Sequence, residues 1–529
     1  MGFASATGYV CSVDSSVARM WKKAFWIGLP IFVWVLATAL YWVGYTGEDD
    51  LFYARYAYLF HRPPILWWEF RMPAILAMRG SFLLFGPTEF AAVLPSLLAS
   101  VAVMASVAWF VGWPRTLTWQ SHSAMLLATL LPIDVGFRSY PSANQISTGF
   151  LALGTVCILK GTRRTPVVGA ALLAVGFLAH EISLFYVALF CLTLLAFDAK
   201  RFGRAVAWCV VFSACLMAAE MIAYAIVLGE PLARLKTAAA APDDLGSISR
   251  ESVRFYIWPI QNLVFGKHFG FDLAALLATA VPAWRRLERE QQILVVATLG
   301  LFFWLGYGSM VPWQYKPLAR EFHFYNCLTP GAAALLPFTL SHALGHRQFL
   351  GKAVIGGALA VHVLSLAATG GWGADVDVSR ELLRHARQHP DQRFLTDVNT
   401  MNQMYVLNGF RIPDNVACLN GEAVKLHLLL NKEPPGSPFY RFPDEHVDAV
   451  LVNRDRTSLQ GFEPEFLDYL RAHGGRRATI AAVRYRPVFA PVMPWVGTRD
   501  FMIRSEGGEL VSVISASAMG VAPATDINR

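Results

Sequence analysis

The chain has 529 residues, of which 55% are hydrophobic, 13% aromatic and 16% charged. So little charge in so long a chain excludes a soluble enzyme and predicts a polytopic α-helical membrane protein. The formal net charge of +8 does not indicate a nucleic-acid partner, because most basic residues flank apolar segments, where they set membrane topology.

The first apolar segment, residues 25–45, is long enough to cross a bilayer, which takes about 20 residues. It is too long for a cleavable signal, and acids follow it instead of a small-residue cleavage site. These acids are Glu48, Asp49 and Asp50. Carboxylates at the end of a membrane helix must face water, a cation or a polar substrate. One acid is enough to cap the next helix, so Asp49 and Asp50 remain candidates for chemistry.

Further apolar segments follow the first one. They lie at residues 90–112, 118–135, 144–159, 165–179, 182–198, 204–228, 261–284, 291–311, 325–344 and 353–371. Together with the first segment they predict about 11 transmembrane helices. These helices would form a membrane module at residues 1–372.

Basic residues indicate the orientation of the predicted helices, because they fall before the first helix and then in every second connection. They are Arg19, Lys22 and Lys23; Arg115; Lys160, Arg163 and Arg164; Lys200, Arg201 and Arg204; Arg285, Arg286 and Arg289; and Arg347 and Lys352. By the positive-inside rule these connections and the N-terminus are cytoplasmic. The loop that carries Asp49 and residues 373–529 then lie outside the cytoplasm.

The last part of the chain, residues 373–529, alternates between helical and strand patterns. Helices are predicted at residues 378–389, 400–408 and 464–473, and strands at 393–397, 447–453 and 477–485. This alternation predicts an extracytoplasmic α/β domain. Of the seven cysteines only Cys418 falls in it, so we predict neither a disulfide framework nor a cysteine metal site.

Three short motifs follow the first predicted helix in a fixed order. After Asp49-Asp50 come Tyr53-Ala54-Arg55-Tyr56, His61-Arg62-Pro63-Pro64 and Phe85-Gly86-Pro87. This order resembles the first extracytoplasmic loop of the GT-C glycosyltransferases. The resemblance is to the branch that contains the protein O-mannosyltransferases and the lipid A aminoarabinose transferase.

The resemblance assigns roles to individual residues. In that branch an acidic pair follows the first helix, a Tyr lies four residues after the first Asp, and a basic residue precedes Pro-Pro. Asp49, Asp50, Tyr53 and Arg62 occupy these positions here. The resemblance therefore implies a glycosyltransferase that moves a hexosyl or pentosyl group from a polyprenyl-phosphate donor to an acceptor hydroxyl, with inversion. Asp49 would be the general base, with Asp50 beside it.

Other external polar residues have two possible roles each, one structural and one at the site. Asn144 is the nearest equivalent of an acid that precedes the family's fourth helix, but capping by Ser142 or Asn144 is equally consistent with the pattern. His180 and Glu181 break a hydrophobic stretch, either as a turn or as part of the site. Arg320 lies among aromatic residues, which suits a phosphate-binding cation or an interfacial anchor.

We predict a site in which Arg62, Arg320 and Lys267 bind the lipid phosphate. The remaining candidate cavity residues are Tyr53, His61, Arg138, Tyr140, Asn144, His180, Glu181, His323 and Tyr325. The acceptor would be a glycan, lipid or protein at the outer face of a bacterial inner membrane, with the C-terminal domain in the periplasm. Oxygen ligands such as Asp49, Asp50 and Glu181 suit a divalent cation, but the resembling branch works without one, and no metal is predicted.

Two other classes of protein fit part of the pattern. A transporter or flippase could use Asp49, Asp50 and Glu181 as ion sites, although no inverted repeat is visible and a large outer domain is atypical. An O-antigen-ligase-like enzyme would be built around external Arg and His residues. The early acid pair and the Arg62-Pro63-Pro64 turn favour the GT-C reading.

Overall fold

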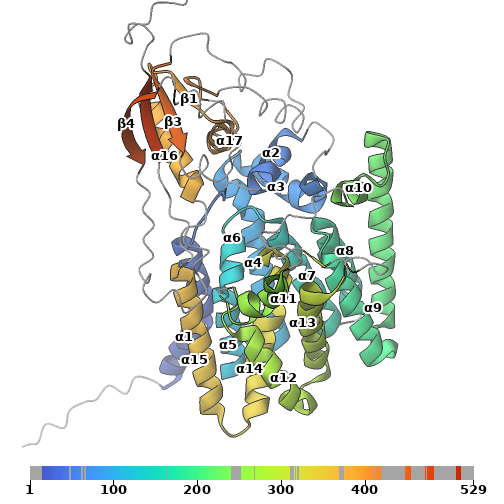
Figure 1. Ribbon diagram of the computed structural model, residues 1–529. Coiled ribbons are helices and arrows are strands. Elements are labelled where there is room, and N and C mark those ends of the chain that lie inside the picture. The colour runs from blue at the N-terminus through green and yellow to red at the C-terminus, as the bar shows by residue number, and fades with distance from the viewer. Residues whose placement is uncertain are drawn as a thin grey trace, which may run out of the picture.

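The structure, a computed structural model, describes part of the chain. The described residues are 15–46, 49–60, 64, 67–162, 164–239, 252–266, 268–309, 315, 317–318, 321–368, 374–411, 413–418, 447–453, 471, 474–481 and 508–513. Helices of the first two thirds stand side by side as a bundle, and a small unit of helices and strands lies at one end of it (Figure 1).

The bundle and its end caps consist of fifteen of the described α-helices and four short 3-10 or π turns. The helices are α1 (Ser15–Leu40), α2 (Asp49–Leu59), α3 (Met72–Phe85), α4 (Glu89–Val111), α5 (Trp119–Leu130), α6 (Pro132–Arg138), α7 (Ala143–Lys160), α8 (Thr165–Ala179), α9 (Ser183–Leu228), α10 (Ala233–Ala239), α11 (Val253–Pro259), α12 (Asp272–Ala283), α13 (Arg289–Tyr307), α14 (Thr329–Leu344) and α15 (Gln348–Ala368). The turns are η1 (Trp67–Phe70), η2 (Ile260–Val264), η3 (Trp284–Arg286) and η4 (Phe322–Leu328).

Every predicted apolar segment overlaps a helix of the bundle. The two segments at 182–198 and 204–228 both lie in α9, whose helix is broken by extended backbone at Asp198. By length and apolar composition, five described helices can each cross a bilayer, or six if the bent pair α6 and α7 counts as one span. The prediction of a helical membrane protein is thus confirmed, whereas the number of spans and their orientation stay predictions.

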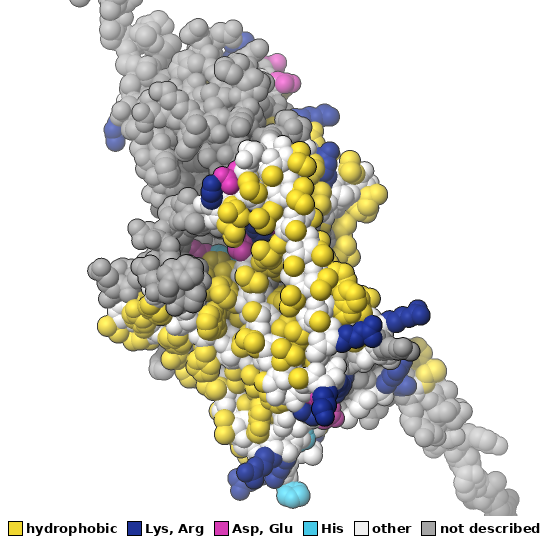
Figure 2. Space-filling model, turned by 90° about the vertical axis from the view of Figure 1, so that its right-hand side faces the viewer, with side chains coloured by type: hydrophobic (Ala, Val, Ile, Leu, Met, Phe, Trp, Pro, Cys, Tyr) yellow, Lys and Arg dark blue, Asp and Glu magenta, His cyan; other side chains and the backbone are white. Residues whose placement is uncertain are grey.

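The outer surface of the bundle is apolar. Figure 2 shows hydrophobic side chains over the middle of one face, with Lys and Arg gathered towards its lower end. On α9, Leu192, Val210 and Ile226 are 65%, 62% and 78% exposed. Such a surface is solvated by lipid tails and not by water.

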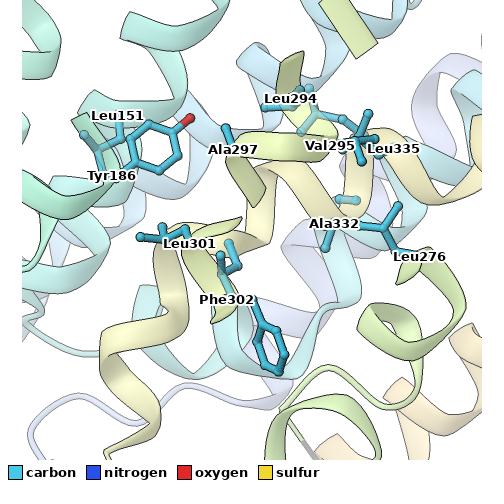
Figure 3. Packing of buried hydrophobic residues seen from close by; sticks show 14 of the residues in the cluster. Leu151, Tyr186, Leu276, Leu294, Val295, Ala297, Leu301, Phe302, Ala332 and Leu335 are labelled. Atoms are coloured by element: carbon cyan, nitrogen blue, oxygen red, sulfur yellow. The ribbon is translucent and has the colours of Figure 1, made fainter. Parts of the chain in front are cut away.

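The interior of the bundle is filled by side chains from helices far apart in sequence. Leu294 and Leu301 of α13 meet Leu335 of α14 and Tyr186 of α9 in one buried cluster (Figure 3). The Tyr186 hydroxyl is 2.7 Å from Thr155 Oγ1 of α7. Because lipid tails are as apolar as the core, close packing and buried hydrogen bonds stabilise such a bundle more than burial from water does.

Two facing glycines allow α7 and α8 to approach closely. A Cβ atom at Gly154 would lie 2.8 Å from the Gly169 carbonyl oxygen, and one at Gly169 would lie 2.7 Å from the Gly154 carbonyl oxygen. Backbones can come this near only where both helices carry a small residue. The two glycines therefore fix the crossing of α7 and α8.

We expect Gly154→Ala to destabilise the protein by about 1–3 kcal/mol, the usual cost of overpacking, measured as the midpoint of unfolding in detergent. Gly28→Ala in α1 is the matched control, because a Cβ atom there would meet nothing within 4 Å and Ala favours a helix. Equal midpoints for the two variants would show that the crossing tolerates a wider spacing.

A buried polar cluster joins α6 to its neighbours. Asp134 accepts hydrogen bonds from Gln145 Nε2 (2.8 Å) and Ser100 Oγ (2.9 Å), and its other contact is Arg138 Nη1 at 3.3 Å. Asn326 Nδ2 donates to Gln145 Oε1 at 2.7 Å. Arg138, predicted from the sequence as a cavity residue, is thus fully buried in an ion pair with Asp134; its proposed role at the site stays a prediction.

The C-terminal α/β unit comprises α16 (Ala374–Gln388), α17 (Val398–Leu407) and a five-stranded sheet. Its strands are β1 (Phe394–Thr396), β2 (Val416–Cys418), β3 (Ala449–Asn453), β4 (Gly474–Ala481) and β5 (Gly508–Val513). The order is β2-β1-β3-β5-β4, with β1 parallel to β2 and β3, and β5 antiparallel to β3 and β4.

Most elements of this unit coincide with predicted ones. α16, β1, α17, β3 and β4 overlap the helices and strands expected from the sequence, whereas β2 and β5 were not predicted. Of the helix predicted at residues 464–473, all but Arg471 lies outside the described residues. The boundary at 372/373 and the periplasmic side of this unit stay predictions.

Candidate functional site

The acidic pair begins helix α2, and its two members differ in their surroundings. Asp50 is 1% exposed and accepts hydrogen bonds from the backbone N–H of Thr46 (2.6 Å) and from its hydroxyl (2.7 Å). Asp50 therefore fixes the turn that leads into α2. The Asp49 carboxylate makes no hydrogen bond to any residue that the structure describes.

A buried arginine lies next to Asp49. Arg71, between η1 and α3, is 2% exposed. It donates from Nη2 to Glu181 Oε1 (2.8 Å) and from Nε to Glu181 Oε2 (3.3 Å), and also to the Tyr53 hydroxyl. This two-pronged contact holds the start of α3 against the turn between α8 and α9.

A second arginine completes the ionic cluster. Arg234 of α10 donates from Nη2 to Glu181 Oε2 at 3.4 Å and from Nη1 to Glu220 Oε1 at 3.0 Å. The Tyr224 hydroxyl also donates to Glu220, at 2.9 Å. The cluster thus ties α10 and the C-terminal part of α9 to the Arg71 pair.

The surroundings of the two carboxyl groups of the site shift their pKa values in opposite directions. Burial raises the pKa of Asp49, an effect that Arg71 and His323 reduce and that Glu321 and Glu181 increase. Burial alone would also raise the pKa of Glu181, but Arg71 and Arg234 hold it well below its ordinary value. Glu181 is therefore a permanent counter-ion, whereas Asp49 is the group that can exchange a proton.

His180 presents a buried donor in the same cluster. It is 1% exposed, and its Nδ1 accepts a hydrogen bond from the Ile182 N–H at 3.3 Å. Burial and the nearby Arg71 lower its pKa well below the ordinary value, so the ring is neutral. With Nδ1 as acceptor, the proton resides on Nε2, which has no hydrogen-bond partner among the described residues.

The other sequence-predicted residues are distributed around this cluster. His323 contacts Glu321 (Nδ1 to Oε2, 2.9 Å), and its ring centre lies 6.5 Å from that of His180. Tyr325 is buried between Trp258 and Phe302 in the bundle core. Tyr140 is half-buried against Phe137, Asn144 is half-buried in the first turn of α7, and His61, Arg62, Lys267 and Arg320 lie outside the described residues.

The structure settles which residue caps α7 and reveals cations that the sequence analysis missed. Ser142, and not Asn144, accepts the hydrogen bond from the Gln145 N–H. Arg71 and Arg234 were not among the predicted site residues. Arg71 stands among apolar and aromatic residues, from Ile65 to Phe85. An arginine in such surroundings needs a partner, which was the local signal for it. Nothing local to Arg234 points to Glu181.

The chain has the helical fold of the GT-C type, and the predicted resemblance is confirmed for the fold. The solved structures that share it include ArnT from Cupriavidus metallidurans in the apo state and the same protein bound to undecaprenyl phosphate. Each is 12% identical to this chain, with a TM-score of 0.54, and the match covers 96% of this chain and 100% of ArnT. No family model and no curated protein matches the sequence.

Proposed function

We propose that the chain is an integral membrane glycosyltransferase that takes a sugar from a polyprenyl-phosphate donor and transfers it to an acceptor hydroxyl at the outer face of the membrane. The observation that carries this proposal is the carboxylate of Asp49, which has a raised pKa beside the buried Arg71. The fold shared with an ArnT that binds undecaprenyl phosphate supports the choice of donor.

The proposed step is a single displacement with inversion. The acceptor oxygen attacks the anomeric carbon of the donor, and its proton passes to Asp49. The bond between the anomeric carbon and the phosphate oxygen breaks, and its electron pair leaves with the polyprenyl phosphate. A base with a raised pKa accepts a proton more readily than an ordinary carboxylate, which suits Asp49 to this task.

The leaving phosphate gains negative charge as it departs, so nearby cations stabilise the transition state more than the ground state. We assign this role to Arg62, Arg320 and Lys267. Arg71 is neutralised by Glu181, and its task is to keep Tyr53 and Asp49 in place.

The test of the donor assignment is binding of a polyprenyl-phosphate analogue to the purified protein. Each charged contact contributes about 1.5–3 kcal/mol, so Arg62→Ala and Arg320→Ala should each weaken binding roughly 10- to 150-fold. The double variant should show non-additive losses, because both cations bind one phosphate. Arg62→Lys should retain part of the affinity, since Lys keeps the charge but not the planar fork.

Two outcomes would contradict the proposed function. If binding is unchanged in both Arg62→Ala and Arg320→Ala, these residues do not bind the lipid phosphate. A proton-coupled flux that Asp49→Asn abolishes, in a protein that transfers no sugar, would indicate a transporter instead.

The proposed orientation has its own test in right-side-out spheroplasts. The starting variant has all seven cysteines replaced by serine and receives one new cysteine at a time. A cysteine at Arg384 of α16, whose side chain is 66% exposed, should react with a membrane-impermeant thiol reagent. A cysteine at the exposed Arg285 should react only after lysis. The reverse pattern would place Asp49 on the cytoplasmic side.

A further inference from the structure

The helix that carries Asp49 packs directly against the C-terminal α/β unit. In Figure 1, α17 lies beside α2 above the bundle. Phe410, just after α17, stacks on Tyr58 of α2 with ring centres 4.3 Å apart and planes at 7°. Its edge also meets Phe82 of α3 at 5.8 Å. Phe410 is 6% exposed, so its ring is buried against Tyr58 of α2 and Phe82 of α3.

The backbone at Phe410 is in a conformation that a large side chain rarely adopts. Its φ angle is +61°, and that of the preceding Gly409 is +66°. A bulky residue with positive φ is strained, and such strain persists where surrounding contacts over-determine it. The contacts here are those with Tyr58 and Phe82. The turn after α17 is thus shaped by its insertion between the two helices.

A buried charge forms a second contact between the two parts. Arg55 of α2 is 2% exposed and donates from Nη1 to Asn402 Oδ1 of α17 at 3.2 Å. Its guanidinium carbon lies 5.4 Å from the ring centre of Tyr405. A buried arginine needs such partners, because an unpaired charge in the interior is costly.

A third contact reaches the loop just before Asp49. Glu89 Oε1 at the start of α4 accepts hydrogen bonds from the Tyr45 N–H at 2.9 Å and from Arg380 Nη2 of α16 at 2.8 Å. The C-terminal unit therefore contacts the chain after Asp49 directly and is linked to the loop before Asp49 through Glu89. Leu51 and Ala54 of α2 also belong to the same hydrophobic cluster as Met404 and Val406 of α17.

Helix α2 has only 11 residues, and isolated helices shorter than about 12–15 residues are marginally stable in water. Its conformation and direction therefore depend on what packs against it. Since a displacement of about 1 Å at a reacting group can cost 10²-fold in rate, the contacts of α2 bear directly on Asp49.

We propose that the C-terminal α/β unit is a positioning element for the catalytic carboxylate, with Phe410, Asn402 and Arg380 as its positioning residues. They hold α2 so that Asp49 faces the Arg71 and His180 cluster. This inference rests on the proposed function for its effect on catalysis, whereas the coupling of the unit to α2 is independent of it.

The experiment compares Phe410→Ala with Phe410→Tyr in the full-length protein. Phe410→Ala should lower kcat about 10-fold or more and change the KM for the donor lipid less than kcat, because the substitution removes none of the proposed phosphate-binding cations. Phe410→Tyr keeps the stacked ring and should retain wild-type kcat. The fall of activity at acid pH should move to a lower pH in Phe410→Ala, because a displaced Asp49 is less buried and burial is what raises its pKa.

Amide hydrogen exchange of residues 49–59 gives a readout that needs no activity. Phe410→Ala and Asn402→Ala should raise exchange in α2 by about 10-fold or more, as expected when a helix loses the packing that stabilises it. If the wild-type protein transfers no sugar, the proposed function fails, and the exchange data still decide whether the unit holds α2.

Asn415→Ala is the matched control for Asn402→Ala. Asn415 Nδ2 donates to the carbonyl oxygens of Ala386, His389 and Gln392 at 2.9, 3.0 and 3.1 Å, all within the C-terminal unit. Its loss should lower the melting temperature without lowering kcat. A fall in kcat equal to that of Asn402→Ala would indicate general damage and overturn the proposal. Unchanged α2 exchange in Phe410→Ala would overturn it as well.

Discussion

Asp49→Asn is expected to lower sugar transfer by at least about 10²-fold, the contribution of a well-placed general base. The amide keeps the size of the carboxylate but accepts no proton at neutral pH. Transfer from a labelled polyprenyl-phosphate donor measures the loss, and donor binding should be unchanged because the phosphate-binding residues are intact.

Asp50→Asn is the matched control. Asp50 is bonded to Thr46, so its replacement should cost less in transfer rate than that of Asp49. If Asp50 proved essential and Asp49 dispensable, the alignment of the acidic pair with the family motif would be wrong by one residue.

The transfer activity that depends on Asp49 should also depend on pH. Burial raises the pKa of Asp49 above the ordinary value of 3.8, and the base must be deprotonated to act. Activity should therefore fall as the pH drops through this raised pKa, at a higher pH than for an ordinary carboxyl group. The residual activity of Asp49→Asn should not show this fall at acid pH.

The second large effect is expected in stability, from Glu181→Gln. Arg71 is 2% exposed, and a neutral amide removes the carboxylate that pairs with its buried charge. Breaking a buried ion pair costs about 3–5 kcal/mol. Denaturant unfolding in detergent measures the loss. Glu230→Gln is the control, because Glu230 pairs with Lys236 at the surface, where an ion pair contributes about 0–1 kcal/mol.

The pH dependence of stability tests the same pair. The folded state holds the pKa of Glu181 well below the ordinary value of 4.5. Its contribution to stability is therefore present above that value and is lost as the pH falls through the lowered pKa. Glu181→Gln should lack this acid-dependent loss. Equal stability of Glu181→Gln and Glu230→Gln would show that the Arg71 pair does not hold the site together.

The sequence predicted features that depend on neighbours along the chain. Apolar runs predicted the helices, and the acids after the first run predicted where α2 begins. Arg138 shows a local signal that was overlooked, since Asp134 lies four residues before it on the same helix face. Arg71 and Arg234 could not be placed, because Glu181 is 110 and 53 residues away from them.

Strand pairing in the C-terminal unit also could not be predicted from the sequence. β5 is a short segment, Gly508–Val513, with a glycine and a glutamate, and its pairing with β3 joins residues far apart in sequence. Such segments become strands because an edge is available to them, and not through their own preference. The contact of Phe410 with α2 depends in the same way on the assembled fold.

The buried polar cluster around Asp134 has a consequence for how the protein enters the membrane. Asp134 and Arg138 meet within one helical turn, so their charges cancel as soon as α6 forms, before any of the later helices has been synthesised. Gln145 also bonds to Asp134, but its own oxygen has to wait for Asn326, which is translated 181 residues later. We expect the first helices to insert as a nearly complete unit that keeps one amide oxygen unsatisfied. The late helices then join the bundle by forming that hydrogen bond, which gives biosynthesis a fixed order of assembly.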